Sequence, residues 1–292
     1  MSCTSPIVGY QPLDGGSLKF GKEPPNHRSV TIACGQCADC RLKKSREWAI
    51  RCVHESQLHD RNCFITLTYS DDNLPPHGSL FKPHLQKFFK RLRKHYCSAA
   101  IRYYACGEYG DNTNRPHYHA CLFGIDFEDK LHFRRIGEHN LYISQKLTDI
   151  WGHGQTSVGS LTFETAAYTA RYVMKKTMGK GCKRYVRLDE ESGELIPLVQ
   201  PFAAMSLRPA IAKEWIEKYY ADIYGADKDF LVWRTKKLKP PAYYDKIYDN
   251  IDNDRLSFLK AKRKTDAQPA TSAQLRARAK NTHARLIART QV

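Results

Sequence analysis

Alternating apolar and polar positions predict several β-strands along the middle of the chain. Residues 63–69 are β-branched and aromatic with a period of two, which is typical of a central strand. Residues 101–108 and 117–124 predict two more strands, and the turn-forming residues between them predict a hairpin. A further hairpin is predicted within 183–201, and a single strand at 29–33 in an otherwise loop-rich start.

Helical periodicity predicts four helices, at 41–59, 81–95, 161–178 and 210–224. Thr162 can cap the third of them. The clearest helix is 81–95, in which apolar residues recur at i, i+3, i+4 and i+7: Leu85, Phe88, Phe89 and Leu92. The succession of strands and helices predicts an α+β protein.

The chain is strongly basic, with a formal net charge of +17 and a pI near 9.4, which indicates a polyanionic partner. Charge alone leaves DNA, RNA and an anionic membrane open. Residues 260–292 hold nine Lys or Arg against the single Asp266. This composition predicts a basic tail that is disordered, or helical only on binding. The 17 tyrosines, interleaved with basic residues, suit stacking on unpaired bases.

Two kinds of segment are not found in the sequence. No apolar stretch approaches the roughly 20 residues that span a bilayer, and the start does not resemble a signal peptide. We therefore expect a soluble, intracellular protein with no membrane partner. No Gly-x-x-x-x-Gly-Lys-Ser/Thr loop occurs, so we expect no nucleotide cofactor and no fused helicase.

Two histidines one residue apart, His117 and His119, lie on the second strand of the predicted central hairpin. Alternate side chains of a strand point to the same face, so both can bind one metal ion. Glu108, on the preceding strand, could reach the same face and supply a third ligand. Two imidazoles and one carboxylate leave positions open for a phosphate oxygen, which favours Mg²⁺ or Mn²⁺. The alternative is that the histidines only pack at the edge of a sheet.

Tyr168 and Tyr172 are four residues apart on the predicted helix 161–178 and would lie side by side on one face. A tyrosine oxygen can attack a phosphate that a metal ion orients, which leaves a covalent phosphotyrosine. Lys175, one turn beyond Tyr172, could favour the phenolate. Core packing is the alternative for the two tyrosines. Together with the histidines and Glu108, they favour a DNA-nicking and joining enzyme.

At this point the chain resembles a known family, the rolling-circle replication initiators of the HUH endonuclease superfamily. It is most similar to the replication-associated proteins of gokushovirus-type microviruses, which are single-stranded DNA phages. The resemblance is carried by five segments: 34–41, 64–69, 106–110 with 115–119, 167–176 and 205–209. One departure follows Pro209, where this chain has Ala210-Ile211-Ala212 and the family tends to have glycines.

The resemblance implies an antiparallel sheet of about five strands flanked by helices, with the metal-binding histidines on a central strand. It implies nicking of single-stranded viral DNA at the origin in the host cytoplasm, with a host helicase and polymerase as partners. We expect four segments: a Cys-rich segment with a basic helix (1–60), the nuclease core (61–180), a hairpin and helical extension (181–258) and the basic tail (259–292).

Five basic residues are candidate DNA contacts. Arg115 directly precedes the histidine segment, and Lys176 follows the tyrosines. The other three, Lys87, Lys90 and Arg91, lie on the polar face of the helix 81–95, where a merely solvated helix face is the alternative.

Four cysteines near the start form a separate candidate site. Cys34 and Cys37 have the Cys-x-x-Cys spacing that chelates zinc, and Cys40 with Cys3 could complete four thiolates. Buried free thiols are the alternative. Such a zinc ion would fasten the start of the chain to the following helix.

Two rivals to the proposed class remain. A plasmid initiator or a transposase of the same superfamily would use the same chemistry on another DNA. A non-enzymatic, zinc-stabilised binder of single-stranded nucleic acid would need neither Mg²⁺ nor Mn²⁺ and would form no covalent adduct.

Overall fold

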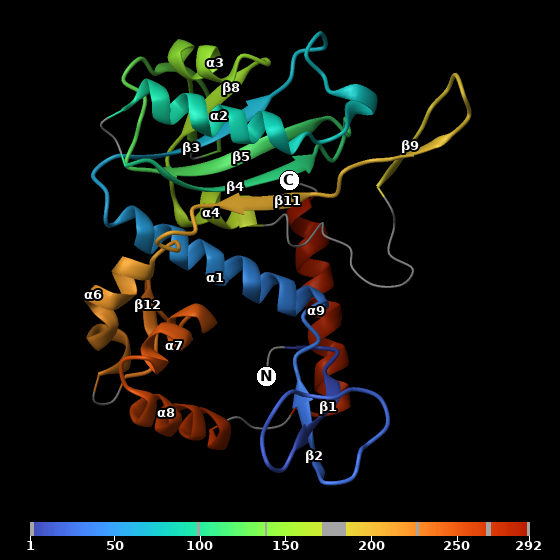
Figure 1. The fold of residues 1–292 in the computed structure, drawn as a ribbon, viewed down its shortest axis with the longest axis vertical. Helices are drawn as coiled ribbons and strands as arrows, with labels where there is room; N and C mark the ends of the chain where they lie inside the picture. Colours follow the sequence, from blue (N-terminus) through green and yellow to red (C-terminus); the bar gives the residue numbers. More distant parts are fainter. Residues whose placement is uncertain are drawn as a thin grey trace. The chain divides into compact units, whose positions relative to one another are not determined.

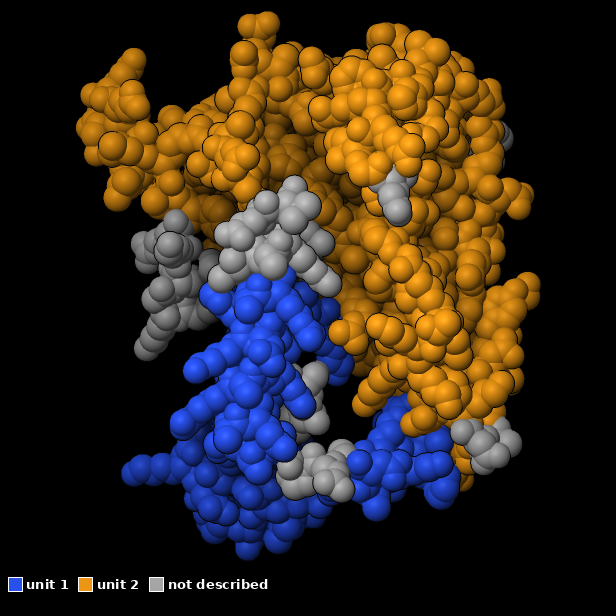
Figure 2. All heavy atoms as spheres, turned by 180° about the vertical axis from the view of Figure 1, so that it is seen from behind, with its two compact units in different colours: residues 1–44, 257–292 blue, residues 45–256 orange. Residues whose placement is uncertain are grey.

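The computed structural model describes residues 3–97, 100–137, 139–170, 185–225, 228–266 and 270–290. The chain forms two compact units, which Figure 2 colours separately. Unit 1 combines residues 1–44 with 257–292, and unit 2 consists of residues 45–256. The predicted division into four segments stays a prediction, because it follows the character of the sequence rather than compactness.

The largest element of unit 2 is a seven-stranded antiparallel sheet with the strand order β11-β4-β5-β3-β8-β7-β6 (Figure 1). Its strands are β3 (Asn62–Thr68), β4 (Arg102–Tyr109), β5 (Pro116–Phe123), β6 (Leu131–Ile136), β7 (His139–Ile143), β8 (Thr156–Gly159) and β11 (Phe202–Met205). The α+β class and the central position of the histidine strand are confirmed. The expected number of about five strands is corrected to seven.

Two features explain the strands that were not expected. All six residues of β6 are exposed, so this strand carries no alternation of buried and exposed positions. β8 has only four residues, which is too short for a periodic pattern to stand out. The sheet therefore extends further beyond β3 than hydrophobic patterning indicates.

Helices cover both faces of the sheet (Figure 1). The helices described are α1 (Ala38–Ser56), α2 (Lys82–His95), α3 (Gln145–Trp151), α4 (Phe163–Ala170), α6 (Lys213–Tyr224), α7 (Ala242–Asp249), α8 (Asn253–Thr265) and α9 (Ser272–Thr290), with a 3₁₀ turn η1 (Pro76–Gly78). None of the helices in the described part of the chain combines the length and the apolarity needed to cross a bilayer.

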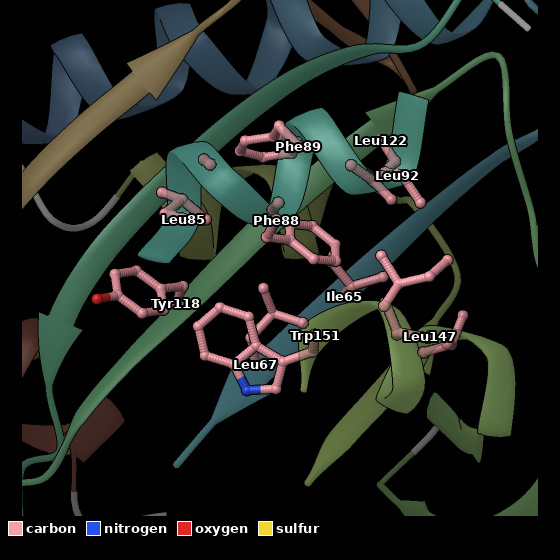
Figure 3. Close-up of a cluster of buried hydrophobic side chains, with 14 of the residues drawn as sticks. Ile65, Leu67, Leu85, Phe88, Phe89, Leu92, Tyr118, Leu122, Leu147 and Trp151 are labelled. Carbon is pink, nitrogen blue, oxygen red and sulfur yellow. The ribbon is translucent and has the colours of Figure 1, made fainter. Parts of the chain in front are cut away.

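The main core lies between the sheet and the helices α2 and α3 (Figure 3). The α2 residues predicted from their spacing, Leu85, Phe88, Phe89 and Leu92, are all buried there. They meet Ile65 and Leu67 of β3, Leu122 of β5, and Leu147 and Trp151 of α3. Tyr118, Ala120 and Leu122 bury the core face of β5, so His117 and His119 point to the opposite face.

That opposite face is covered in part by α1 and α4. Trp48 of α1 stacks on Tyr104 of β4, with the ring centroids 4.7 Å apart. The Ser45 hydroxyl donates a hydrogen bond to the Ala167 carbonyl of α4. Thr162 caps α4 as predicted, because its hydroxyl accepts a hydrogen bond from the Thr165 N–H at 3.2 Å. The helix is described to Ala170, and the remainder of the predicted helix, 171–178, lies outside the described residues.

Three two-stranded sheets complete the strands of the described residues. In unit 1, β1 (Ile7–Pro12) pairs with β2 (His27–Ile32), so the predicted strand has a partner that patterning missed. In unit 2, β9 (Val186–Leu188) and β10 (Leu195–Pro197) form the predicted hairpin, and β12 (Leu231–Trp233) pairs with β13 (Lys236–Leu238).

The basic tail is a correction to the expectation of disorder, because the structure has helices α8 and α9 there. The tail is rich in Ala, Arg, Lys, Gln and Leu, which are strong helix formers even where little apolar surface is buried. In unit 1 the Thr282 hydroxyl of α9 donates a hydrogen bond to Asp39 of α1 at 2.9 Å. Low apolar content therefore predicted the lack of a large core correctly but not the backbone.

The departure after Pro209 coincides with an unusual backbone. Ala212, the N-cap of α6, has φ 58°, in the left-handed region that favours glycine, and it is fully buried. The expected difference from a glycine-containing segment is therefore a side chain in a conformation that glycine adopts more easily.

Candidate functional site

The register of the central hairpin brings the three predicted metal ligands together. Glu108 of β4 lies directly opposite His117 of β5, and His119 follows two residues further along the same face. Glu108 Oε1 lies 3.4 Å from Nε2 of His117 and 3.4 Å from Nε2 of His119. One ligand atom from each of the three side chains lies within 4.8 Å of the others. The predicted convergence is confirmed.

Both imidazoles are oriented by contacts at their other ring nitrogen. His117 Nδ1 lies 3.1 Å from the Arg115 carbonyl, and His119 Nδ1 lies 3.0 Å from the Thr66 hydroxyl of β3. The ring of Phe64 stacks on His119 with an interplanar angle of 11°. Contacts at Nδ1 of this kind hold the Nε2 atoms of metal-binding histidines toward the ion.

Tyr168 stands beside this cluster. Its ring meets that of His119 edge to face, with the centroids 4.9 Å apart, and 40% of its surface is exposed. α4 is anchored by the next residue, Thr169, which is fully buried and contacts Cys121 of β5 at 3.7 Å. A buried anchor and an exposed phenol on consecutive residues place the phenol at the edge of the metal-binding triad.

The cluster opens into a pocket of about 310 Å³, whose lining includes Thr66, Thr68, Arg115, His117, His119 and Tyr168. Arg115 is held in place because its guanidinium donates to the Asp71 carboxylate at 2.6 Å and to the Tyr69 carbonyl at 3.0 Å. The pocket thus joins metal-ligand chemistry, a phenol and a guanidinium on one solvent-accessible surface.

Tyr69 also lines this pocket, but its hydroxyl points into the core. It makes 3.0 Å hydrogen bonds with the Tyr118 hydroxyl and with His84 Nδ1. Burial, with the neighbouring Tyr118, raises the pKa of Tyr69 well above its usual value. Tyr168 is therefore the better nucleophile of the two tyrosines that line the pocket.

The structure does not bring every predicted residue to this site. Lys87, Lys90 and Arg91 lie on α2, which covers the opposite face of the sheet. Arg91 donates 2.7 Å hydrogen bonds to the carbonyls of Ile150 and Trp151 at the end of α3. The other predicted residues, Tyr172, Lys175 and Lys176, lie outside the described residues.

Thr66 is a site residue that sequence reasoning missed. It lies opposite His119 across the β3–β5 ladder, as Thr68 lies opposite His117. The signal was present in the alternation of residues 63–69, which places both threonines on one face, but the partner of β3 could not be read from it.

The four predicted cysteines also converge, within unit 1. Their sulfur atoms all lie within 4.8 Å of one another, and Cys3 Sγ lies 3.6 Å from Cys34 Sγ and 3.8 Å from Cys37 Sγ. A tetrahedral zinc ion with Zn–S bonds of about 2.3 Å separates its sulfurs by about 3.8 Å. The arrangement fits a four-thiolate metal site, and all four side chains are free of disulfides.

Backbone amides support the same cluster. The N–H groups of Gln36 and Cys37 donate to Cys34 Sγ at 3.4 and 3.3 Å. Burial acts to raise the pKa of the Cys37 thiol, but hydrogen bonds from Thr4 and the backbone outweigh it and lower the pKa to about 6. A thiol with such a pKa is readily available as the thiolate that binds metal ions.

Comparison with known proteins agrees with this geometry. Residues 62–177 match the family model of replication-associated proteins of the ORF2 type. The chain is 32% identical to replication-associated protein VP4 of Bdellovibrio phage phiMH2K over 94% of this chain and 86% of that protein. It is 32% identical to replication-associated protein ORF2 of Spiroplasma virus 4 over 82% and 74% of the two chains.

A third relative aligns over a shorter region. Replication-associated protein ORF4 of Chlamydia phage 1 is 34% identical over 51% of this chain and 39% of its own length. No solved structure matches the chain.

Proposed function

Because this chain belongs to the replication-associated proteins of microvirus-type phages, we propose that it initiates replication by nicking single-stranded viral DNA at the origin and later rejoining it. The observation that carries the proposal is the convergence of Glu108, His117 and His119 beside the exposed phenol of Tyr168. Ligands for a divalent ion and a nucleophile on one open pocket suit phosphoryl transfer to a tyrosine.

Glu108, His117 and His119 would hold Mg²⁺ or Mn²⁺. One carboxylate and two imidazoles, with their Nε2 atoms toward the carboxylate, leave further coordination positions for water and phosphate oxygens. When bound, the ion orients the cleaved phosphate and offsets the charge that develops on its oxygens. Thr66 and the Arg115 carbonyl keep the two imidazoles in the required orientation.

Tyr168 would supply the attacking oxygen. Its phenolate oxygen forms a bond to phosphorus while the bond from phosphorus to the 3′ oxygen breaks, and that oxygen leaves as a 3′ hydroxyl after taking up a proton. The 5′ end of the strand stays joined to the protein as a phosphotyrosine. An ordinary tyrosine has a pKa near about 10 and must be activated, for which we propose the bound ion or Lys175.

Rejoining reverses these bonds. A 3′ hydroxyl attacks the phosphotyrosine, the tyrosine oxygen leaves, and the phosphodiester forms again without ATP, because the phosphotyrosine keeps the energy of the original bond. Tyr172, one helical turn from Tyr168 in the predicted helix 161–178, would provide a second nucleophile while the first is occupied.

The DNA strand would be positioned by basic side chains. Arg115 lies in the pocket itself and is the first candidate for a phosphate contact, with Lys176 predicted nearby. Lys87, Lys90 and Arg91 on the far face of the sheet would act away from the cleaved phosphate. We propose that the protein acts inside the host cell, where a host helicase unwinds the duplex and a host polymerase extends the 3′ hydroxyl.

We further propose that Cys3, Cys34, Cys37 and Cys40 hold a structural zinc ion in unit 1. Four thiolates close the coordination shell and leave no position for a substrate, which is typical of zinc sites that stabilise a fold. This ion would take no part in cleavage.

The test is the formation of a covalent adduct between the protein and a labelled single-stranded library made from phage-origin sequences, in the presence of Mn²⁺. Denaturing gels would compare the wild type with Tyr168→Phe, Tyr172→Phe, the double variant and His119→Ala. Tyr109→Phe is the matched control, because Tyr109 is a buried tyrosine on the neighbouring strand β4.

We expect a metal-dependent adduct that the double tyrosine variant and His119→Ala do not form, and that Tyr109→Phe still forms. Retention of DNA by the wild type without any cleavage, across the sequences and metals tried, would contradict the enzyme and favour a non-enzymatic binder of single-stranded nucleic acid.

A further inference from the structure

A second pocket adjoins the proposed active site on its β8 side. β7 pairs with β8 at two positions, Leu141 with Gly159 and Tyr142 with Val158. The first half of β8 pairs with β3 alone among the described strands, so the sheet opens between this half and the end of β7. The opening holds a pocket of about 920 Å³.

The two pockets share a wall. Thr66 and Thr68 of β3 line both the active-site pocket and this second pocket. A strand of DNA that crosses the metal-binding triad and passes over β3 would therefore enter the second pocket directly. Its volume is near the upper end for pockets that enclose a small molecule, so it has room for more than one base.

A β-bulge shapes the far wall of this pocket. Within the β6–β7 ladder, His132 pairs with Tyr142 and Arg134 pairs with Leu141, which leaves Phe133 as an extra residue in β6. A bulge redirects side chains that would otherwise alternate, and here two consecutive residues, Phe133 and Arg134, both line the pocket. The Arg134 guanidinium lies 5.5 Å from the Phe133 ring centroid.

The exposure of Phe133 needs a reason. This ring is 57% exposed, and Leu131 and Ile143 beside it in the pocket lining are exposed too. An aromatic ring with a guanidinium next to it, on a surface strand, is the arrangement that binds unpaired bases: the ring stacks on a base and the cation meets a phosphate.

The opposite wall accepts bases better than phosphates. Asp129 accepts hydrogen bonds from the Ser144 hydroxyl at 2.7 Å and from the Lys146 N–H at 2.9 Å. Burial acts to raise the pKa of Asp129, but these hydrogen bonds outweigh it and lower the pKa, so the carboxylate stays charged. It repels phosphate, as does Glu128, whereas the exocyclic amines of bases can donate to such carboxylates.

We propose that this second pocket binds unpaired bases of the DNA strand next to the cleaved phosphate, with Phe133 stacking on a base and Arg134 holding the adjoining phosphate. The pocket thereby contributes to the choice of origin sequence. This proposal rests on the proposed function, because the strand that enters the pocket is the one cleaved at the metal site.

The first experiment measures binding of the full chain to a labelled (dT)30 strand by fluorescence anisotropy, without added Mg²⁺ or Mn²⁺. Phe133→Ala and Arg134→Ala are compared with Ile136→Ala and Arg135→Ala, which change the same strand at residues that do not line the pocket. Ile136 is a close match for Phe133 because it is 52% exposed.

We expect the pocket variants to bind about tenfold more weakly, the size of one lost stacking contact, and the controls to bind within about twofold of the wild type. Equal weakening by all four variants, or no weakening by any, overturns the pocket. Circular dichroism and thermal unfolding establish that these exposed substitutions leave the fold unchanged.

The second experiment sequences the DNA ends in covalent adducts formed from a random single-stranded library with Mn²⁺. We expect the wild type to prefer particular bases close to the cleaved phosphate and Phe133→Ala to lose part of that preference while it still forms adducts. The same preference in wild type and Phe133→Ala contradicts a role of the pocket in base choice.

The two experiments separate the two proposals. If the wild type forms no adduct but Phe133→Ala and Arg134→Ala still weaken (dT)30 binding, the proposed nicking fails and the pocket stands. If the wild type forms adducts and these variants behave like it in both experiments, the pocket fails and the nicking stands.

Discussion

Two groups of metal-ligand side chains occur in this molecule, and they differ in every property that decides what a bound ion can do. On the sheet, Glu108 offers a hard carboxylate oxygen and two histidines offer imidazole nitrogens, next to a pocket of about 310 Å³. In unit 1, four thiols face one another, and two of them, Cys3 and Cys40, are buried. The first group leaves coordination positions for a substrate, and the second leaves none.

The difference lies also in how the backbone builds each group. The ligands on the sheet are fixed by strand register, which sets Glu108 opposite His117 on rigid neighbouring strands. The thiols connect Cys3 with a turn more than 30 residues further along, so an ion there closes a long loop. A rigid frame suits the positioning of a phosphate, whereas loop closure suits the stabilisation of a small unit.

The largest effect we expect is on the fold of unit 1 when its thiol cluster loses the metal. Structural zinc contributes about 10–16 kcal/mol in zinc-finger peptides, and a whole domain is stable by about 5–15 kcal/mol. Cys34→Ser combined with Cys37→Ser should therefore unfold unit 1. Limited proteolysis with mass spectrometry would detect cleavage within residues 1–44, and elemental analysis would detect the loss of one zinc ion per chain.

Cys97→Ser is the matched control, because Cys97 is an exposed thiol outside the cluster. The comparison of the two sites would break if the purified wild type held no zinc and the double serine variant resisted protease as well as the wild type. Nicking of short strands by the double variant would sharpen it, since the ligands Glu108, His117 and His119 lie in unit 2.

The next effect in size is on catalysis when the carboxylate of the sheet site is neutralised. Glu108→Gln keeps the shape of the side chain and removes the charged ligand. Since electrostatic stabilisation by a metal ion is worth several kcal/mol, we expect adduct formation to slow by about 10³-fold. The rate of adduct formation at saturating Mn²⁺ measures this, and the zinc content should not change.

Glu164→Gln serves as its control, because Glu164 lies on α4 close to Tyr168 in the sequence but pairs with Arg234 at the surface. A Glu108→Gln variant that forms adducts at the wild-type rate would remove Glu108 from the metal site and leave the two histidines without a carboxylate partner.

The sequence predicted the sheet site better than its surroundings, for physical reasons. Alternation places His117 and His119 on one face, and turn-forming residues place Glu108 on the adjacent strand, so local rules suffice for the triad. The neighbours of that triad come from strands distant in the sequence. Thr66 reaches His119 because β3 pairs with β5, a choice of partner that no local pattern contains.

The elements that sequence reasoning missed share one property: little of their stability comes from a buried face. β6 exposes all its residues, and the second pocket exists because β7 leaves β8 after two residue pairs. α8 and α9 form in a tail that hydrophobic content alone predicted to be disordered. In the thiol cluster the spacing of Cys34 and Cys37 indicated chelation, but the approach of Cys3 depends on the path of the first strand pair.

The smallest effect we expect arises from a residue that touches no metal ion. Thr66→Val keeps the volume of the side chain and removes the hydroxyl that lies 3.0 Å from His119 Nδ1. Loss of a contact that orients a ligand typically lowers metal affinity about 10- to 100-fold. Adduct formation by Thr66→Val should therefore need correspondingly more Mn²⁺ and reach close to the wild-type rate when Mn²⁺ is saturating.

A matched change at Thr68, which lies opposite His117 on the same strand and hydrogen bonds to the Gln155 carbonyl instead of to an imidazole, isolates that contact. Thr68→Val should leave the Mn²⁺ dependence unchanged. If both valine variants shift the Mn²⁺ dependence equally, the effect comes from the strand as a whole, and His119 does not depend on the Thr66 hydroxyl for its orientation. If Thr66→Val alone shifts it, the sheet site relies on a hydroxyl from a neighbouring strand, whereas the thiol cluster is supported by backbone amides of its own turn.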